Sequence, residues 1–340
     1  MRMARIKISG RGAVYHCISR IVGEERLLGE LEKEKLRHLL WHQAAFSGIV
    51  ILTYCLMSNH IHLLVRVPAP VTPSDPELVE RAVAFYGTTS PYVHTLREAL
   101  AQSGHLPEDL RAGLLSRMGD VSAFMKELKQ RFSRWFNRMH HRLGTLWAER
   151  FKSLVVEDEP GAVAAVAAYI DLNPVRAGLV SDPKDYRWCG YGEAVGGHEG
   201  ARRGLASFHG LEDWGSVGRE YRKLLLVSAV RAGHSGKVAL EREAIRRELG
   251  AVKEYPSHFA AGHWACGRGA SDEHTRQRSV RSERQSPRAQ GPQPCGSPRR
   301  GGIRFVAPQS QRSRLCSFVA PRRCPHGAGD KVQRLFLDGP

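Results

Sequence analysis

Two histidines, His60 and His62, stand one residue apart in this sequence, at the start of an apolar run that extends to Val67. Side chains alternate between the two faces of a β-strand, so a strand here would place both imidazoles on one face and Ile61 on the other. Two neighbouring imidazoles form a ready pair of metal ligands. Two partly exposed histidines opposite a core face would have the same spacing, so the pair alone does not decide between a metal site and a structural role.

The residues before the pair predict how it is presented. Residues 49–57 have the composition of a strand, and Ser58 and Asn59 suit the tight turn of a hairpin. The histidines would then begin the outgoing strand. They would lie near an edge where a ligand can reach them.

A second segment, roughly a hundred residues later, carries a candidate nucleophile. The alanine-rich stretch 164–168 favours a helix, and a helix places Tyr169 and Asn173 on one face, four residues apart. Pro174 disfavours helical geometry at Asn173, so both side chains should belong to the last turn. A core aromatic followed by a helix-ending Asn-Pro pair is the alternative for this segment in isolation.

Together, the two segments resemble the Y1 transposases of the IS200-like type, and more closely the REP-associated tyrosine transposases of the HUH endonuclease superfamily. The resemblance covers about residues 4 to 195. It is carried by five short stretches in the same order as in the family: 60–62, 124–126, 136–137, 144–153 and 169–178.

The resemblance implies a ferredoxin-like α+β domain that cuts and rejoins single-stranded DNA through a 5′-phosphotyrosine. Carried over by position, His60 and His62 would be metal ligands, Tyr169 the nucleophile and Asn173 a further polar metal ligand. The implied cofactor is Mg²⁺ or Mn²⁺, although imidazole ligands by themselves suit manganese or zinc better than magnesium. The implied partner is single-stranded DNA in hairpin form. The sequence leaves open whether Tyr169 acts within one chain or across a homodimer.

From these patterns we predict an α+β fold: a ferredoxin-like sheet with helices on one face, a helical insertion and a disordered basic C-terminal tail. The predicted divisions are a transposase-like domain at 1–195 with its insertion at about 69–119, a small mostly helical appendage at 196–254, and the tail at 255–340. The predicted elements of the first domain are strand 14–20, helix 30–46, hairpin 49–67, helix 121–140, strand 150–157 and helix 161–173.

The predicted helix 121–140 has two stripes. One is apolar and is expected to face the core: Phe124, Leu128, Phe132, Trp135, Phe136 and Met139. The other is basic and includes Lys126, Arg131, Arg134 and Arg138. The sequence alone does not tell whether the basic stripe is a solvated face or a track for phosphates.

Composition fits a polyanionic partner. The chain has 340 residues and a formal net charge of +17, and residues 255–340 hold fourteen Arg and one Lys against five acidic residues. That tail could be a nucleic-acid arm or an out-of-frame extension. No signal peptide or 18-residue apolar span is evident, so we expect a cytoplasmic, nucleoid-associated protein with no membrane partner. The seven cysteines are scattered without a Cys-x-x-Cys pair, which favours free thiols.

Two other classes of protein share some of these features. A histidine-triad nucleotide hydrolase would need a third alternating histidine at position 64, where this chain has Leu64. A catalytically inactive DNA-binding or regulatory protein derived from a transposase would keep the fold and the charge but lose the chemistry. The presence of His60, His62 and Tyr169 together favours the active enzyme.

Overall fold

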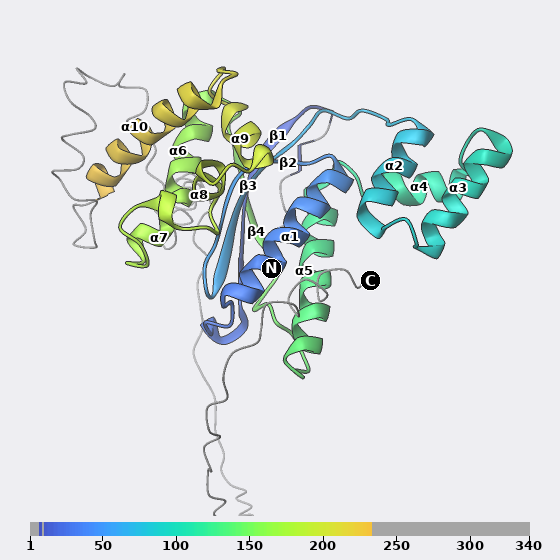
Figure 1. The fold of residues 1–340 in the computed structure, drawn as a ribbon, viewed down its shortest axis with the longest axis horizontal. Coiled ribbons are helices and arrows are strands. Elements are labelled where there is room, and N and C mark those ends of the chain that lie inside the picture. Colours follow the sequence, from blue (N-terminus) through green and yellow to red (C-terminus); the bar gives the residue numbers. More distant parts are fainter. Residues whose placement is uncertain (1–6, 9, 233–340) are drawn as a thin grey trace, which may run out of the picture. The chain divides into compact units, whose positions relative to one another are not determined.

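The computed structural model describes residues 7–8 and 10–232 (Figure 1). The tail predicted at 255–340 and the end of the appendage predicted at 196–254 lie outside these residues. Within the described ranges, no helix is long and apolar enough to cross a membrane.

Four antiparallel strands form the sheet that carries the two histidines. They are β1 (Ala13–Arg20), β2 (Val50–Leu56), β3 (His60–Val67) and β4 (Lys152–Val156). Their order across the sheet is β2-β3-β1-β4, so β3 and β1 lie in the middle. The backbone N–H of Met57 donates to the carbonyl of His60 at 2.9 Å, which confirms the predicted tight turn between β2 and β3.

One face of the sheet is covered by two long helices, α1 (Glu30–Ser47) and α5 (Val121–Met139) (Figure 1). The chain order β1-α1-β2-β3-α5-β4, with this strand order, is the predicted ferredoxin-like arrangement. Alternate strand residues pack under the helices. Four residues of the predicted apolar stripe of α5 are buried, Phe124, Leu128, Phe132 and Phe136, whereas Trp135 and Met139 are only partly buried. The core on this face includes Tyr15, Cys17, Ile61, Leu63, Leu36, Leu40, Phe124, Phe132 and Phe136.

The opposite face of the sheet is covered as well, by α6 (Pro160–Asp171) and α9 (Glu199–Ala206), and α10 (Trp214–Ala232) packs on these two helices. The sequence predicted helices on one face of the sheet; α1 and α5 form that layer, and the helices on the opposite face are an addition to it. Both faces of the sheet carry apolar side chains, and each must be shielded from water. The core on this second face includes Val14, Leu52, Leu64, Val163, Ala167, Leu205, Tyr221 and Leu225.

The segment after residue 195 contributes directly to this second core, through Leu205 of α9 and Leu225 of α10. The boundary of an appendage at that point stays a prediction. Shorter elements complete this part of the chain: α7 (Asn173–Arg176), α8 (Gly190–Val195) and the 3₁₀ turns Val22–Glu24 and Pro183–Asp185.

The insertion between β3 and α5 is helical, as expected. It contains α2 (Asp75–Tyr86), α3 (Pro91–Ser103) and α4 (Glu108–Leu115). These helices have a small core of their own, including Leu78, Ala82, Val93, Leu96 and Leu114, which extends to Phe46 near the end of α1.

A buried carboxylate fastens α6 in place. Asp171, the last residue of α6, is fully buried and accepts hydrogen bonds from Thr53 Oγ1 at 2.9 Å, Tyr221 O–H at 2.6 Å and the Tyr191 backbone N–H at 3.1 Å. These donors belong to β2, α10 and α8, respectively. Burial raises the pKa of Asp171 to about 6, although the donors act in the opposite direction.

We expect Asp171 to make the protein less stable as pH rises. Its folded-state pKa of about 6 lies above that of an unfolded aspartate, so the stabilisation is complete at low pH and is lost as pH rises through about 6. Between about pH 4 and pH 7 the free energy of unfolding should fall by about 2–3 kcal/mol relative to Asp171→Asn, whose amide does not titrate. Urea titrations of both proteins measure the difference. Parallel pH profiles would contradict the assignment.

Candidate active site

The sheet places His60 and His62 at the beginning of β3, on the face that α6 covers. His62 pairs with Ile18 of β1 and is 4% exposed, whereas His60 pairs with Arg20 and is partly exposed. Their ring centroids are 5.0 Å apart, with the rings nearly perpendicular. The two imidazoles are thus close neighbours at one end of the sheet, where the hairpin turn leaves one of them accessible.

One nitrogen of each imidazole is held by a neighbouring side chain. His60 Nδ1 lies 2.7 Å from Asn59 Oδ1, and His62 Nδ1 lies 3.0 Å from His16 Nε2. Among the described residues, neither Nε2 atom has a hydrogen-bond partner. This arrangement orients both rings and leaves Nε2 as the nitrogen that could bind a cation.

His16 is the site residue that the sequence analysis missed. It lies on β1, is 5% exposed and stacks on His62 with ring centroids 5.2 Å apart. Its sequence context is an ordinary alternating strand, and only the pairing of β1 with β3 brings it to His62. A polar residue at a core-facing position of a buried strand was the one signal that could have found it.

All three imidazoles are neutral at physiological pH. Burial lowers the pKa of His16 and of His60 to about 4 each, with Arg20 adding to the effect at His60. Burial also lowers the pKa of His62, and the adjacent His16 and His60 lower it further. A neutral imidazole has a free lone pair, so protonation does not compete with a cation at neutral pH.

The packing of α6 brings the candidate nucleophile to the histidines. The ring centroid of Tyr169 is 6.1 Å from that of His62 and 6.3 Å from that of His16, with the rings edge to face. The side chain of Tyr169 is half-buried. Two segments that lie far apart in the sequence thus meet at one face of the sheet.

Asn173 lies at the end of α6, where it has a structural role. Its Nδ2 donates to the carbonyls of Tyr169, at 3.2 Å, and Ile170, at 3.1 Å. Pro174 was expected to take Asn173 out of helical geometry, but the chain turns directly into α7, which Asn173 begins. Proline is tolerated in the first turn of a helix because the N–H that it lacks would have no partner there.

Arg176 adds a positive charge to this corner of the site. Its guanidinium lies 4.6 Å from the centroid of the Tyr169 ring, and Nη1 donates to the Tyr169 carbonyl at 3.3 Å. Burial lowers the pKa of Arg176. This arginine lies within the family-like stretch 169–178, and its contact with the Tyr169 ring follows only from the turn between α6 and α7.

The ligand set for a cation is incomplete in protein side chains alone. Within the described part of the chain, no three His, Cys, Asp or Glu side chains are grouped so as to hold a metal ion. His60 and His62 provide two imidazoles, which suits a site completed by water, substrate oxygen or an amide. The role of Asn173 as a metal ligand stays a prediction.

A comparison with known protein families finds a match over the part of the chain that contains the three histidines. Residues 11–82 match the family model described as "Transposase IS200 like". These residues form part of an IS200-like Y1 transposase domain. The matched residues contain His16, His60 and His62, but they end before α6 and Tyr169.

Among curated proteins, none matches the chain. Among solved structures, that of a REP-associated tyrosine transposase bound to a REP hairpin is similar, with 16% sequence identity and a TM-score of 0.36; the likeness covers 58% of this chain and 86% of that chain. A likeness of this size carries no conclusion about the chemistry of the IS200-like domain described here.

We expect His16 to support cation binding by the IS200-like domain. In His16→Phe the ring volume is kept but Nδ1 of His62 loses its partner, and losing such a support typically lowers metal affinity by about 10–100-fold. Calorimetric titration with Mn²⁺ measures this. His94→Phe, which changes an exposed histidine of α3, is the control and should bind Mn²⁺ like the wild type. Equal affinity of His16→Phe and wild type would show that the bond to His62 does not set the ligand nitrogen.

Proposed function

We propose that this protein is a metal-dependent single-stranded DNA endonuclease and transposase that cleaves and rejoins DNA through a 5′-phosphotyrosine intermediate, at hairpin or repeat sequences. The observation that carries the proposal is the approach of the Tyr169 ring to within 6.1 Å of the His62 ring, between centroids. It places a candidate nucleophile beside a pair of neutral imidazoles. The match of residues 11–82 to the IS200-like family supports the same conclusion.

The donor set fits a divalent cation, Mg²⁺ or Mn²⁺. His60 and His62 would hold it through Nε2, with the amide oxygen of Asn173 as a further ligand. When bound, such a cation polarises a phosphodiester and offsets the negative charge that develops during attack. Other residues of the protein position the reacting groups. His16 and Asn59 orient the two imidazoles, and α6 holds the Tyr169 phenol next to them.

The covalent step needs a deprotonated phenol. The hydroxyl of Tyr169 loses its proton, its oxygen bonds to phosphorus, and the 3′ oxygen of the DNA leaves and takes up a proton. The protein is then joined to the 5′ phosphate. The reaction replaces one phosphodiester by another, so a free 3′-hydroxyl can reverse it without a nucleotide cofactor. Arg176 places a positive charge beside the Tyr169 ring, where negative charge develops.

The proposal predicts a covalent protein–DNA adduct. Purified protein incubated with a divalent cation and a single-stranded hairpin substrate should form a species that survives denaturing gel electrophoresis, with the label on the fragment whose 5′ phosphate is joined to the protein, that is, on the 3′ side of the cut. Tyr169→Phe should abolish it. An adduct of equal yield in Tyr169→Phe would show that the nucleophile lies elsewhere. Absence of any adduct in the wild type would favour the inactive DNA-binding alternative.

The role proposed for Asn173 can be separated from its role at the end of α6. Asn173→Ala removes both the amide oxygen and the donor to the Tyr169 carbonyl, so it should slow cleavage and raise the metal concentration needed for half-maximal rate. Misplacing reacting groups by about 1 Å can lower a rate on the order of a hundredfold. Asn173→Asp loses the same donor but keeps an oxygen, so it should bind metal at least as well as the wild type.

Metal titrations of the cleavage rate and thermal melts distinguish the two roles. A fall in melting temperature common to both variants, with unchanged metal requirement, would leave Asn173 as a helix-capping residue. His60 and His62 would then be the remaining ligands.

A further inference from the structure

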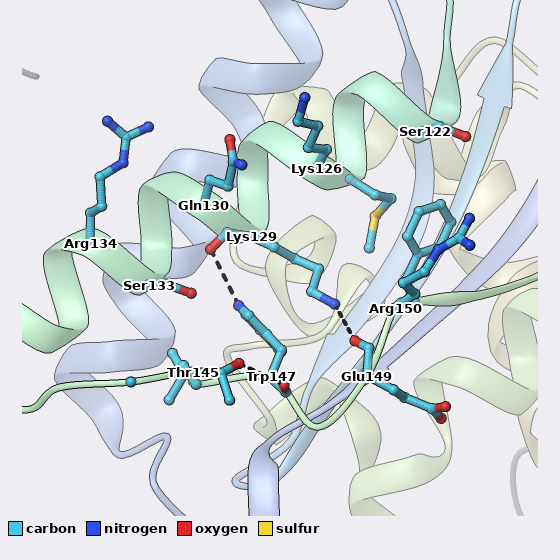
Figure 2. A pocket seen from close by; sticks show the side chains of 14 residues that line it. Ser122, Lys126, Lys129, Gln130, Ser133, Arg134, Thr145, Trp147, Glu149 and Arg150 are labelled. Atoms are coloured by element: carbon cyan, nitrogen blue, oxygen red, sulfur yellow. Dashed lines mark hydrogen bonds between the residues drawn. The ribbon is translucent and has the colours of Figure 1, made fainter.

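A second site lies away from Tyr169, between α5 and residues 144–151, the segment that leads into β4 (Figure 2). It is a cavity of about 930 Å³, at the upper end of the range for ligand sites. Its lining combines apolar and basic side chains. The apolar part is the floor, where the outer edge of the core reaches the cavity: Met125, Leu146, Trp147 and Phe151, each at most 7% exposed. The basic part is Lys126, Lys129, Arg134 and Arg150.

Hydrogen bonds join α5 to residues 144–151, the two walls of the cavity. Trp147 Nε1 donates to the Lys129 carbonyl at 3.2 Å, and Lys129 Nζ donates back to the Glu149 carbonyl at 2.9 Å (Figure 2). At the other end, Asn137 Nδ2 donates to the Gly144 carbonyl at 2.9 Å. Both walls are therefore fixed before any ligand arrives, which lowers the entropic cost of binding.

The cations at the rim have no anionic partner among the residues that the structure describes. Lys126, Arg134 and Arg150 are exposed, and within residues 10–232 they make no hydrogen bond or ion pair. Figure 2 shows Lys126 and Arg134 projecting from the same side of α5, eight residues or about 12 Å apart along the helix. Glu149 is the one acidic residue in the lining, and it pairs with Lys152 at 3.2 Å.

The basic stripe predicted on this helix thus has two different parts. Arg131 packs its guanidinium over Phe85 of the insertion, 4.1 Å from the ring centroid, and serves the fold. Lys126 and Arg134 face the cavity instead. Arg138 is exposed outside it.

The cavity adjoins the end of the sheet where the histidines lie. Ala148 N–H donates to the carbonyl of Arg20 at 3.0 Å, and Arg20 pairs with His60. One strand further, Lys152 pairs with the same β1 residue as His62, so it lies in the same row and on the same face of the sheet. The β4 edge therefore lies between the cavity and the histidine face, and the Lys152–Glu149 ion pair lies at this edge.

We propose that this cavity binds a single-stranded DNA segment that flanks the cleaved phosphodiester, with Lys126, Arg134 and Arg150 on phosphates of that segment and the apolar floor against an unpaired base. The inference rests on the proposed function, because that function supplies single-stranded DNA as substrate. A row of cations about 12 Å long suits a repeated phosphate chain rather than one small anion. An apolar floor suits a base whose face is exposed, which a duplex does not offer.

The test measures DNA binding without cleavage. In the full chain carrying Tyr169→Phe, the triple variant Lys126→Gln, Arg134→Gln and Arg150→Gln is compared with its parent by fluorescence anisotropy on labelled oligothymidylate of about twenty nucleotides. Three lost phosphate contacts should reduce the slope of log affinity against log salt by about 2. At about 0.1 M salt they should weaken binding roughly a hundredfold.

A matched triple variant controls for net charge. Arg97→Gln, Arg138→Gln and Arg203→Gln removes the same charge from exposed arginines outside the cavity and should keep the parental slope. Thermal melts check that both triples fold. Equal losses in the two triples would overturn the cavity as a DNA site, and an equal loss on duplex DNA would overturn its assignment to single strands.

The result also separates the two proposals. Formation of the tyrosine adduct by the wild type, together with unchanged binding by the cavity triple, would reject the cavity and keep the enzyme. Loss of binding in the cavity triple, without an adduct in the wild type, would keep the cavity and reject the enzyme.

Discussion

The position of Tyr169 depends on one buried carboxylate two residues further along the same helix. An ionised Asp171 in the core would be strongly destabilising without donors, and β2, α8 and α10 each provide one. Because those donors come from three directions, they fix both the rotation and the depth of α6 over the sheet. Tyr169 projects from the same helix, so its distance from His62 is set by hydrogen bonds that do not involve the site itself.

The two faces of the sheet have different roles. On β3, alternation sends Ile61 and Leu63 to the core under α1 and α5, and sends His60 and His62 toward α6. A slip of one residue in the pairing of β1 with β3 would exchange the faces and separate His16 from His62. The apolar face therefore maintains the register on which the polar face depends.

The features that could be predicted from the sequence are those whose signal lies within one helix, strand or turn. The hairpin, the alternation that puts His60 and His62 together and the amphipathic α5 all follow from spacing within one element. His16 could not be found in that way, because its partner lies on another strand, forty-six positions along the chain. The second layer of helices was missed for a related reason: α9 and α10 have the composition of a separate appendage, and only their packing against α6 and β2 shows that they complete the core.

Arg176 is a partly buried cation beside the candidate nucleophile. Its half-buried guanidinium contacts the Tyr169 ring and carbonyl, and in the described part of the chain it has no carboxylate partner. Withdrawing a cation from water without a counter-charge is unfavourable, and burial lowers the pKa of Arg176 accordingly. A phosphodiester placed between the phenol and the imidazoles would bring the missing negative charge. If the proposed function holds, the interaction with the phosphate would offset a cost already present in the fold of the free protein.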